Sequence, residues 1–338
     1  MLARGVYGGR QLTHQNVFGG LKVKPGSKNR SFIEAGPYFP HKRAWLRQYV
    51  RIPFTVICGS RQGPTLCVTA GVHGTEYAGI EAASRLANEL KPEDLIGTLI
   101  VVPLVNGPAF KERTYNCPID GVNLQGNFPG KLDGSIGQTM IYKLFKELVS
   151  KADYYLDLHG ADSHESERCH AGFYVTGIDD IDKRSQDMAR HLGFKYVLRY
   201  MTGECTGSSW RVAPENGIPS ALCECGQGDR LLPEEASGIM EGVLNVMGYL
   251  KMVGGIPKET GEQNIISSAK ICVNSSGMFH MRVQVGDILE KGDLIGEVKD
   301  LEGRVLETVC APSRGVVLLT IHNPVVELGE KLMTFGYL

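Results

Sequence analysis

The stretch TLCVTAGVHGTEYAGIEAASRLANEL, residues 65–90, decides the fold class of this chain. Its first eight residues form a short, continuous apolar run, which is typical of a strand buried on both faces of a sheet. Gly74 ends this run, and residues 76–90 then carry apolar side chains at helical spacing. A buried strand, a tight turn and a helix in this order predict one unit of an α/β layer.

The alternation of strand and helix continues to about residue 254. Further strands are predicted at 47–58, 98–105, 153–160, 173–177, 195–201 and 218–226. Further helices are predicted at 137–151, 180–193 and 233–254. A long segment, 106–130, holds seven Gly or Pro residues without a clear period and is predicted to be a functional loop. Repeated units of this kind predict a mixed, mostly parallel sheet flanked by helices.

The composition changes after Gly254. A polar linker, IPKETGEQN (256–264), leads to short apolar segments separated by Gly-Asp turns. Within them, QVGDILEKGDLIGEV (284–298) resembles VVELGEKLMTFG (325–336), which indicates a repeated short β unit. We therefore predict three parts: an N-terminal arm at 1–30, a large α/β domain at 31–255, and a small all-β barrel-sandwich domain at 265–338.

Charge and composition exclude several classes of function. The formal net charge is −1 and no basic stripe is present, so a nucleic-acid partner is not expected. No run of about 18 apolar residues occurs, and the first residues lack the apolar core of a signal peptide. The nine cysteines are scattered along the chain, and we expect reduced thiols in a cytoplasmic protein.

Polar side chains suited to metal binding or acid–base chemistry stand where three predicted strands end. His73 follows TLCVTAGV, His159 follows DYYLDL, and Glu224 follows IPSALC. In open α/β sheets, ligands bind beyond the carboxyl ends of the strands. We therefore expect these three side chains to share one site.

His73 and Glu76 form an HxxE pair at the turn between the first of these strands and its helix. Zn²⁺ accepts imidazole nitrogen and carboxylate oxygen, and catalytic zinc sites leave one position free. The dipole of a helix also favours a glutamate at the N-terminus, so the pair alone does not establish a metal site. With His159 added, the pattern predicts one Zn²⁺ per chain. Asp157 is expected to orient His159 or to form a strand-end ion pair.

Four motifs in this order resemble the succinylglutamate desuccinylase and aspartoacylase family. They are HGTE (73–76), NGPAF…PIDGVNLQGNFPG (106–130), DLHG (157–160) and CECG (223–226). The resemblance spans about residues 45–255, and the C-terminal part resembles the β-rich domain of bacterial members. It implies a zinc carboxypeptidase-like fold. It also implies a hydrolase that cleaves the amide bond of an N-acylated amino acid or a related small amine.

The resemblance also implies roles for individual residues. His73, Glu76 and His159 would be the zinc ligands, and Glu224 would be the catalytic acid–base group. The family stabilises the tetrahedral oxyanion with an arginine in the loop before the DGxNL motif. Arg113 is the arginine of this loop, and a solvated loop arginine is the alternative.

The chain departs from the family directly after the leucine of DGxNL. The family has Asn-Arg there, a pair that holds a substrate carboxylate, whereas this chain has Gln125 and Gly126. Glycine cannot replace the bidentate contact of arginine with a carboxylate. We therefore expect a substrate that lacks this carboxylate or presents it elsewhere. Gln125, Asn123 and Arg211 are the candidate substrate-binding residues.

Other functions stay open at this point. A zinc carboxypeptidase would need a clamp for a C-terminal carboxylate, and Gly126 argues against one. A non-catalytic binding protein of the same fold is favoured by the missing arginine and disfavoured by the complete set of ligands. The predicted partner is a small N-acyl compound, with neither nucleic acid nor membrane, and a homo-oligomer is left open.

Two further features have ordinary explanations. His164, Cys169 and His170 follow DLHG and are predicted to lie in a polar loop over the site rather than in a second metal cluster. The C-terminal Gly-Asp pattern also resembles biotinyl and lipoyl carrier domains, but no Met-Lys-Met sequence is present. The C-terminal domain is therefore expected to cap the cleft or to mediate assembly.

Overall fold

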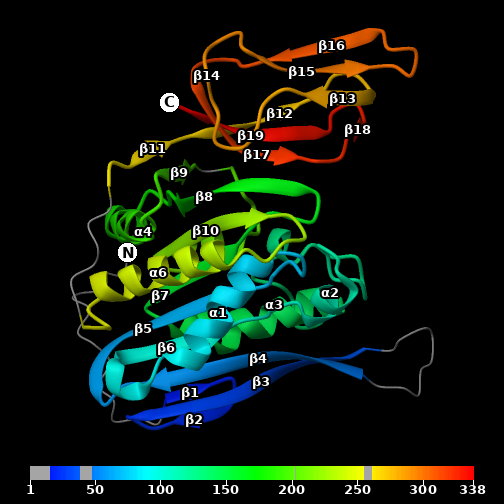
Figure 1. The fold of residues 1–338 in the computed structure, drawn as a ribbon. Helices are drawn as coiled ribbons and strands as arrows, with labels where there is room; N and C mark the ends of the chain where they lie inside the picture. Colours follow the sequence, from blue (N-terminus) through cyan, green and yellow to red (C-terminus); the bar gives the residue numbers. More distant parts are fainter. Residues whose placement is uncertain (1–15, 39–47, 202, 255–260) are drawn as a thin grey trace.

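The structure is a computed structural model that describes residues 16–38, 48–201, 203–254 and 261–338 (Figure 1). Its centre is one mixed sheet of 13 strands, in which the main path runs β12-β19-β17-β8-β10-β7-β5-β6-β4-β3. On the N-terminal side its strands are β3 (Ser27–Tyr38), β4 (Gln48–Cys58), β5 (Arg61–Ala70), β6 (Ile96–Val102), β7 (Tyr154–His159), β8 (Glu165–Tyr174), β9 (Tyr196–Tyr200) and β10 (Ser220–Gln227). On the C-terminal side they are β11 (Asn264–Ile266), β12 (Ser268–Cys272), β14 (Ile288–Leu289), β17 (Gly315–Ile321) and β19 (Lys331–Tyr337).

Helices cover both faces of this sheet, as predicted. They are α1 (Tyr77–Glu89), α2 (Gly107–Glu112), α3 (Ile136–Glu147), α4 (Asp179–His191), α5 (Ser209–Glu215) and α6 (Pro233–Tyr249), with 3₁₀ turns η2 (Pro92–Asp94), η3 (Leu124–Gly126) and η4 (Val149–Lys151). Helices α1, α4 and α6 bury apolar side chains in one core, and α3 and α5 bury theirs in a second core. Two apolar layers around one sheet confirm the predicted α/β class.

The site is positioned by three adjacent parallel strands. β5 pairs in parallel with β7, and β7 pairs in parallel with β10. Each of these strands is almost wholly buried at its carboxyl end, which explains why the sequence there is continuously apolar. Because parallel strands end at the same edge, the residues that follow them lie together.

The C-terminal strands form a β sandwich at one end of the main sheet (Figure 1). A four-stranded antiparallel sheet, β16-β15-β13-β18, makes one layer. Its strands are β13 (Gly277–Met281), β15 (Leu294–Lys299), β16 (Val305–Cys310) and β18 (Val325–Val326). The other layer joins the main sheet, because β17 pairs antiparallel with β8. The predicted all-β unit is therefore present. Through β17 it is continuous with β8, the strand that lies beside β10 in the main sheet.

The predicted domain boundaries stay predictions. Residues 1–15 of the predicted arm, residue 255 of the predicted α/β domain and residues 256–260 of the predicted linker lie outside the described residues. Of the rest of the arm, β1 (Asn16–Phe18) and β2 (Leu21–Val23) form a hairpin, and residues 27–30 already belong to β3. No helix among the described residues is long and apolar enough to cross a membrane.

Two expectations about secondary structure were wrong. The segment 106–130 is not a continuous loop, because it contains α2 and η3. The polar loop predicted after DLHG is short, because β8 begins at Glu165 and therefore includes Cys169 and His170. Strand β8 has an irregularity in its pairing with β10, so its residues do not follow a simple alternation of polar and apolar side chains. The period-two pattern therefore did not reveal this strand.

The expectation that all nine cysteines are reduced was also wrong. Cys169 on β8 and Cys225 on β10 form a disulfide, with Cα atoms 4.1 Å apart. They are separated by 56 residues, and only the pairing of the two strands brings them together. The other seven cysteines are free thiols, most of them buried.

Candidate metal centre and active site

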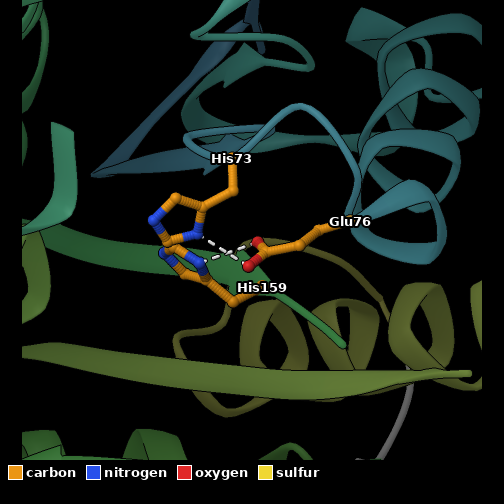
Figure 2. A group of neighbouring side chains, drawn as sticks. All are labelled: His73, Glu76 and His159. Carbon is orange, nitrogen blue, oxygen red and sulfur yellow. Dashed lines mark hydrogen bonds and ion pairs between the residues drawn. The ribbon is translucent and has the colours of Figure 1, made fainter. Parts of the chain in front are cut away.

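Three buried side chains converge at the edge of the sheet (Figure 2). His73 and Glu76 come from the turn between β5 and α1, and His159 is the last residue of β7. His73 Nδ1 lies 2.7 Å from Glu76 Oε1, and His159 Nδ1 lies 2.8 Å from Glu76 Oε2. One ligand atom of each residue lies within 4.8 Å of the others, and each residue is at most 3% exposed.

The outer nitrogen of each imidazole is held by an oxygen atom. His73 Nε2 donates to Asn123 Oδ1 at 3.0 Å, and this amide oxygen also accepts from the backbone N–H of Gln125. His159 Nε2 donates to Asp157 Oδ2 at 3.0 Å, and both predicted roles of Asp157 use this contact. With both protons on Nε2, both Nδ1 atoms keep a free lone pair directed at the common site.

This donor set fits a divalent cation. Glu76 is buried, and its two carboxylate oxygens face the Nδ1 atoms of the two histidines. Burial raises the pKa of Glu76, but the two histidines outweigh burial and lower the pKa to about 2. Two imidazole nitrogens and one carboxylate are the ligands of catalytic zinc sites that keep an open position. The three residues that the sequence predicted as ligands therefore come together in a group that could hold a metal ion.

Gly74 allows the HGTE turn to lie against α2. A Cβ atom at this position would lie 2.2 Å from the backbone carbon of Ala109, and the Gly74 N–H donates to Thr114 O at 3.2 Å. The turn that carries His73 and Glu76 is thus packed directly on the backbone of α2. No other residue fits there without moving the turn or the helix.

Gly74→Ala is expected to destabilise the protein by about 3 kcal/mol, because backbone atoms cannot yield to the added methyl group. It is also expected to reduce the metal content, since the displaced turn carries two ligands. Chemical denaturation and metal analysis measure both effects. Gly107→Ala is the control in the same region, because a Cβ there meets nothing within 4 Å. Equal stability of the two variants would contradict this account.

Glu224 lies beside the ligand group. Its Cα is the direct partner of the His159 Cα in the parallel pairing of β10 with β7. Burial raises the pKa of Glu224 well above its usual range, and the neighbouring Glu167 adds to the rise. Burial likewise raises the pKa of Glu167 to about 8, and the neighbouring Glu165 adds to the rise. The predicted acid–base residue thus lies next to a metal ligand, as part of a pair of carboxyl groups.

Asn123 and Gln125 contact the ligands themselves. Besides the contact of Asn123 with His73, Gln125 Nε2 lies 3.1 Å from His159 Nε2 and donates to Asp157 Oδ2 at 3.5 Å. Gln125 Oε1 accepts from the backbone N–H of Ser209. Asn123 therefore holds His73, and Gln125 lies against the His159–Asp157 pair. The predicted contact of both residues with a substrate stays a prediction.

The two candidate arginines differ in their surroundings. Arg113 is exposed at the C-terminal end of α2, where its backbone is left-handed, with φ of 55°. Arg211 on α5 forms an ion pair with Glu215 at 3.0 Å and donates to Thr206 Oγ1 at 2.9 Å. The role predicted for Arg113 at the oxyanion and the role predicted for Arg211 at the substrate stay predictions.

Two residues near the metal centre were missed by the sequence analysis. The ring of Tyr115 stacks on His73, with centroids 3.6 Å apart and an angle of 12° between the planes. Burial raises the pKa of Tyr115, and nearby carboxylates add to the rise, so its phenol keeps its proton. Glu167 is the other missed residue. Neither stands at a predicted strand end, so no sequence signal separated them from their neighbours.

Comparison with known proteins agrees with this geometry. Residues 62–250 match the succinylglutamate desuccinylase/aspartoacylase catalytic domain. The chain is 29% identical over 257 residues to the N-alpha-acetyl-L-2,4-diaminobutyric acid deacetylase of Halomonas elongata, an alignment that covers 75% of each chain.

Solved structures share the fold over nearly the whole chain. A succinylglutamate desuccinylase/aspartoacylase from Rhodobacter sphaeroides superposes with a TM-score of 0.82 at 25% identity, covering 93% of this chain and 97% of that one. The product-bound ectoine utilization protein EutE (DoeB) from Ruegeria pomeroyi gives a TM-score of 0.85 at 23% identity, covering 94% and 98%. The catalytic-domain match includes all three metal-binding side chains and Glu224. The chain therefore belongs to the succinylglutamate desuccinylase/aspartoacylase family of deacylating enzymes.

Proposed function

We propose that the protein is a zinc-dependent deacylase that hydrolyses the amide bond of an N-acylated amino acid or a related small amine. The observation that carries this proposal is the convergence of His73, Glu76 and His159 beside Glu224. The family membership and the deacetylase of Halomonas elongata support the reaction class. The identity of the metal as zinc rests on the chemistry of the donor set.

Each residue of the site has its own proposed role in the reaction. A zinc ion held by the two Nδ1 atoms and the Glu76 carboxylate would polarise the amide carbonyl and lower the pKa of water to about 7. Glu224 then takes a proton from the attacking water and returns it to the leaving amine. Asn123 and Asp157 keep the two imidazoles in the tautomer that leaves Nδ1 free. We keep Arg113 as the proposed donor to the oxyanion.

The substrate is proposed to lack the carboxylate that the Asn-Arg pair of the family holds. Gly126 provides no side chain at the second of these positions, and a Cβ there would meet nothing within 4 Å. Gln125 at the first position is engaged with Asp157 and Ser209. Arg211, the remaining candidate, already pairs with Glu215. These contacts favour a neutral or amine-bearing acyl compound.

Gly126→Arg is expected to increase kcat/KM for N-acetyl-L-aspartate at least tenfold, since a guanidinium can bind a carboxylate in bidentate fashion. The open space at this position predicts that the melting temperature changes by no more than a few degrees. Gly126→Leu is the control that adds volume without charge. Suppose that Gly126→Arg folds and binds metal but has no higher kcat/KM for N-acetyl-L-aspartate than Gly126→Leu. This result would contradict the proposal that glycine at position 126 removes a binding site for a substrate carboxylate.

A substrate screen tests the proposed function directly. Purified protein is assayed with N-acetyl, N-succinyl and N-formyl amino compounds, including Nα-acetyl-L-2,4-diaminobutyrate. We expect release of a free amine that stops after treatment with a chelator and returns when Zn²⁺ is added. Metal analysis is expected to give one zinc per chain. Protein that contains no metal and cleaves no acyl compound would instead indicate a binding protein of the same fold.

Cytoplasmic location and assembly into a homo-oligomer also stay proposals. The Cys169–Cys225 disulfide argues against a cytoplasmic location, because structural disulfides are rare in reducing compartments. Alkylation of the denatured protein without reductant measures how many of the nine cysteines are free in the cell of origin. Light scattering of the purified chain measures the oligomeric state.

A further inference from the structure

Asp157 accepts hydrogen bonds from two hydroxyl groups as well as from His159. It lies on β7 and is fully buried. Its Oδ2 atom accepts from His159 Nε2 at 3.0 Å and from the hydroxyl of Ser209. Its Oδ1 atom accepts from the hydroxyl of Thr69 at 2.6 Å. Each oxygen of this buried carboxylate is therefore held by a hydroxyl group from another element.

Thr69 reaches Asp157 from the neighbouring strand. The two residues are partners in the parallel pairing of β5 with β7, so their side chains lie on the same face of the sheet. Thr69 is fully buried, as are its apolar neighbours Val68 and Ala70, and its oxygen also lies 2.6 Å from the hydroxyl of Tyr155. A hydroxyl has one proton, so Thr69 donates to Asp157 and accepts from Tyr155. A chain of hydrogen bonds therefore runs from Tyr155 through Thr69 to Asp157.

Ser209 brings a different part of the chain to the same carboxylate. It is the first residue of α5, and it is fully buried. Its backbone N–H donates to Gln125 Oε1 at 3.4 Å, and Gln125 Nε2 donates to Asp157 Oδ2 at 3.5 Å. The start of α5, the segment 106–130 and β7 therefore meet at Asp157.

The two hydroxyl groups have a consequence for the metal-binding group. Burial of a hydroxyl costs free energy unless it is hydrogen-bonded, and valine or alanine would fill the same places without that cost. Both hydroxyls donate to the carboxylate that contacts His159. Groups behind a histidine ligand fix its tautomer and the orientation of its ring. Holding Asp157 in one orientation therefore keeps His159 Nδ1 directed at Glu76, 2.8 Å from Oε2.

We propose that Thr69 and Ser209 are positioning residues of the metal centre, which hold Asp157 and, through it, the ring of His159. Thr69 acts from the strand that leads into the HGTE turn, and Ser209 acts from the helix that carries Arg211. This inference rests on the metal centre of the proposed function and is independent of the identity of the substrate.

Thr69→Val and Ser209→Ala test the proposal in the full-length protein. Valine has nearly the shape of threonine but lacks the hydroxyl, and alanine removes only the hydroxyl of serine. We expect each variant to bind Zn²⁺ about tenfold more weakly, because loss of such supporting contacts lowers metal affinity about 10- to 100-fold. Competition between the metal-free protein and a coloured chelator measures this affinity without a substrate. The absorption spectrum of bound Co²⁺ is also expected to change, because it depends on the geometry of the ligands.

Matched variants separate the hydroxyl contacts from stability. Thr69→Ser loses a buried methyl group, and with it some stability, but keeps the hydroxyl and is expected to keep the wild-type affinity. Ser208→Ala is the control for Ser209→Ala, because Ser208 is also buried but its side chain forms no hydrogen bond at the start of α5. In the background of Asp157→Ala, Ser209→Ala is expected to add no further loss, because the group through which it acts is gone.

The outcomes distinguish this inference from the proposed function. If Thr69→Val and Ser209→Ala bind Zn²⁺ and Co²⁺ as the wild type does, or if Thr69→Ser loses as much affinity as Thr69→Val, the hydroxyls have no positioning role. If the wild type binds no metal, the proposed function fails, and NMR of the ¹⁵N-labelled protein still tests the inference. The Nε2 proton of His159, assigned with His159→Ala, is expected to exchange faster with water in both variants. Unchanged exchange overturns the inference.

Discussion

Replacing Glu224 with glutamine is expected to lower kcat about 1,000-fold or more while leaving the metal content unchanged. Glutamine keeps the volume and the hydrogen-bonding capacity of the side chain but cannot accept a proton. Glu224 is not one of the three metal-binding residues, although its Cα is paired with that of His159. The loss should therefore appear in kcat, with the site still assembled.

Steady-state kinetics and metal analysis on the same preparation measure this effect. Glu34→Gln is a suitable control, because Glu34 forms an exposed ion pair with Arg51 at the far edge of the sheet. Exposed pairs of this kind contribute only about 0–1 kcal/mol, so this control should keep full activity. A Glu224→Gln enzyme with bound metal and a wild-type rate would remove Glu224 from the mechanism.

His159→Ala is expected to abolish both metal binding and activity. The variant leaves one imidazole and one carboxylate, too few protein ligands for a catalytic zinc site. It also leaves Asp157, which is fully buried, without the imidazole that donates to its Oδ2 atom. We therefore expect less than about one tenth of the wild-type zinc content, a rate at least about 1,000-fold lower, and a lower melting temperature.

Mass spectrometry of the metal and a thermal melt measure these losses. His280→Ala is the matched control, because His280 lies exposed on β13, in the C-terminal unit. It should retain one zinc per chain and the wild-type rate. If His159→Ala still held a full equivalent of zinc, the ligand set would have to include another residue, and the hydrolase mechanism proposed for this centre would need revision.

Much of the fold and the metal centre could be predicted because the relevant signals are local. The apolar runs before His73 and His159 and the helical spacing after Glu76 each lie within about ten residues. A short apolar run bounded by turn residues favours a strand buried on both faces, and parallel strands end at one edge. The three ligands and Glu224 were therefore predicted to meet, and the structure places them together.

The contacts of the remaining site residues depend on pairings that leave no local trace. Tyr115 stands in a segment without a period, and only the packing of that segment on the HGTE turn brings its ring onto His73. Glu167 faces Glu224 because β8 contains one extra residue in its pairing with β10. Cys169 and Cys225 meet through the same two strands.

The sequence by itself therefore determined the candidate chemistry of the centre: which side chains form the group that could hold a metal ion, which carboxylate stands beside them, and at which position the arginine expected from the family resemblance is replaced by glycine. Only the tertiary structure decided which distant groups come together around it, such as the tyrosine that stacks on His73 and the cysteines that pair between β8 and β10. The physical reason is that secondary-structure patterns follow from neighbouring residues. The register, the bulge and the docking of β17 on β8 follow from the packing of the whole sheet. Its paired residues stand far apart in the sequence, such as Glu224 with His170 and Ile321 with Glu165.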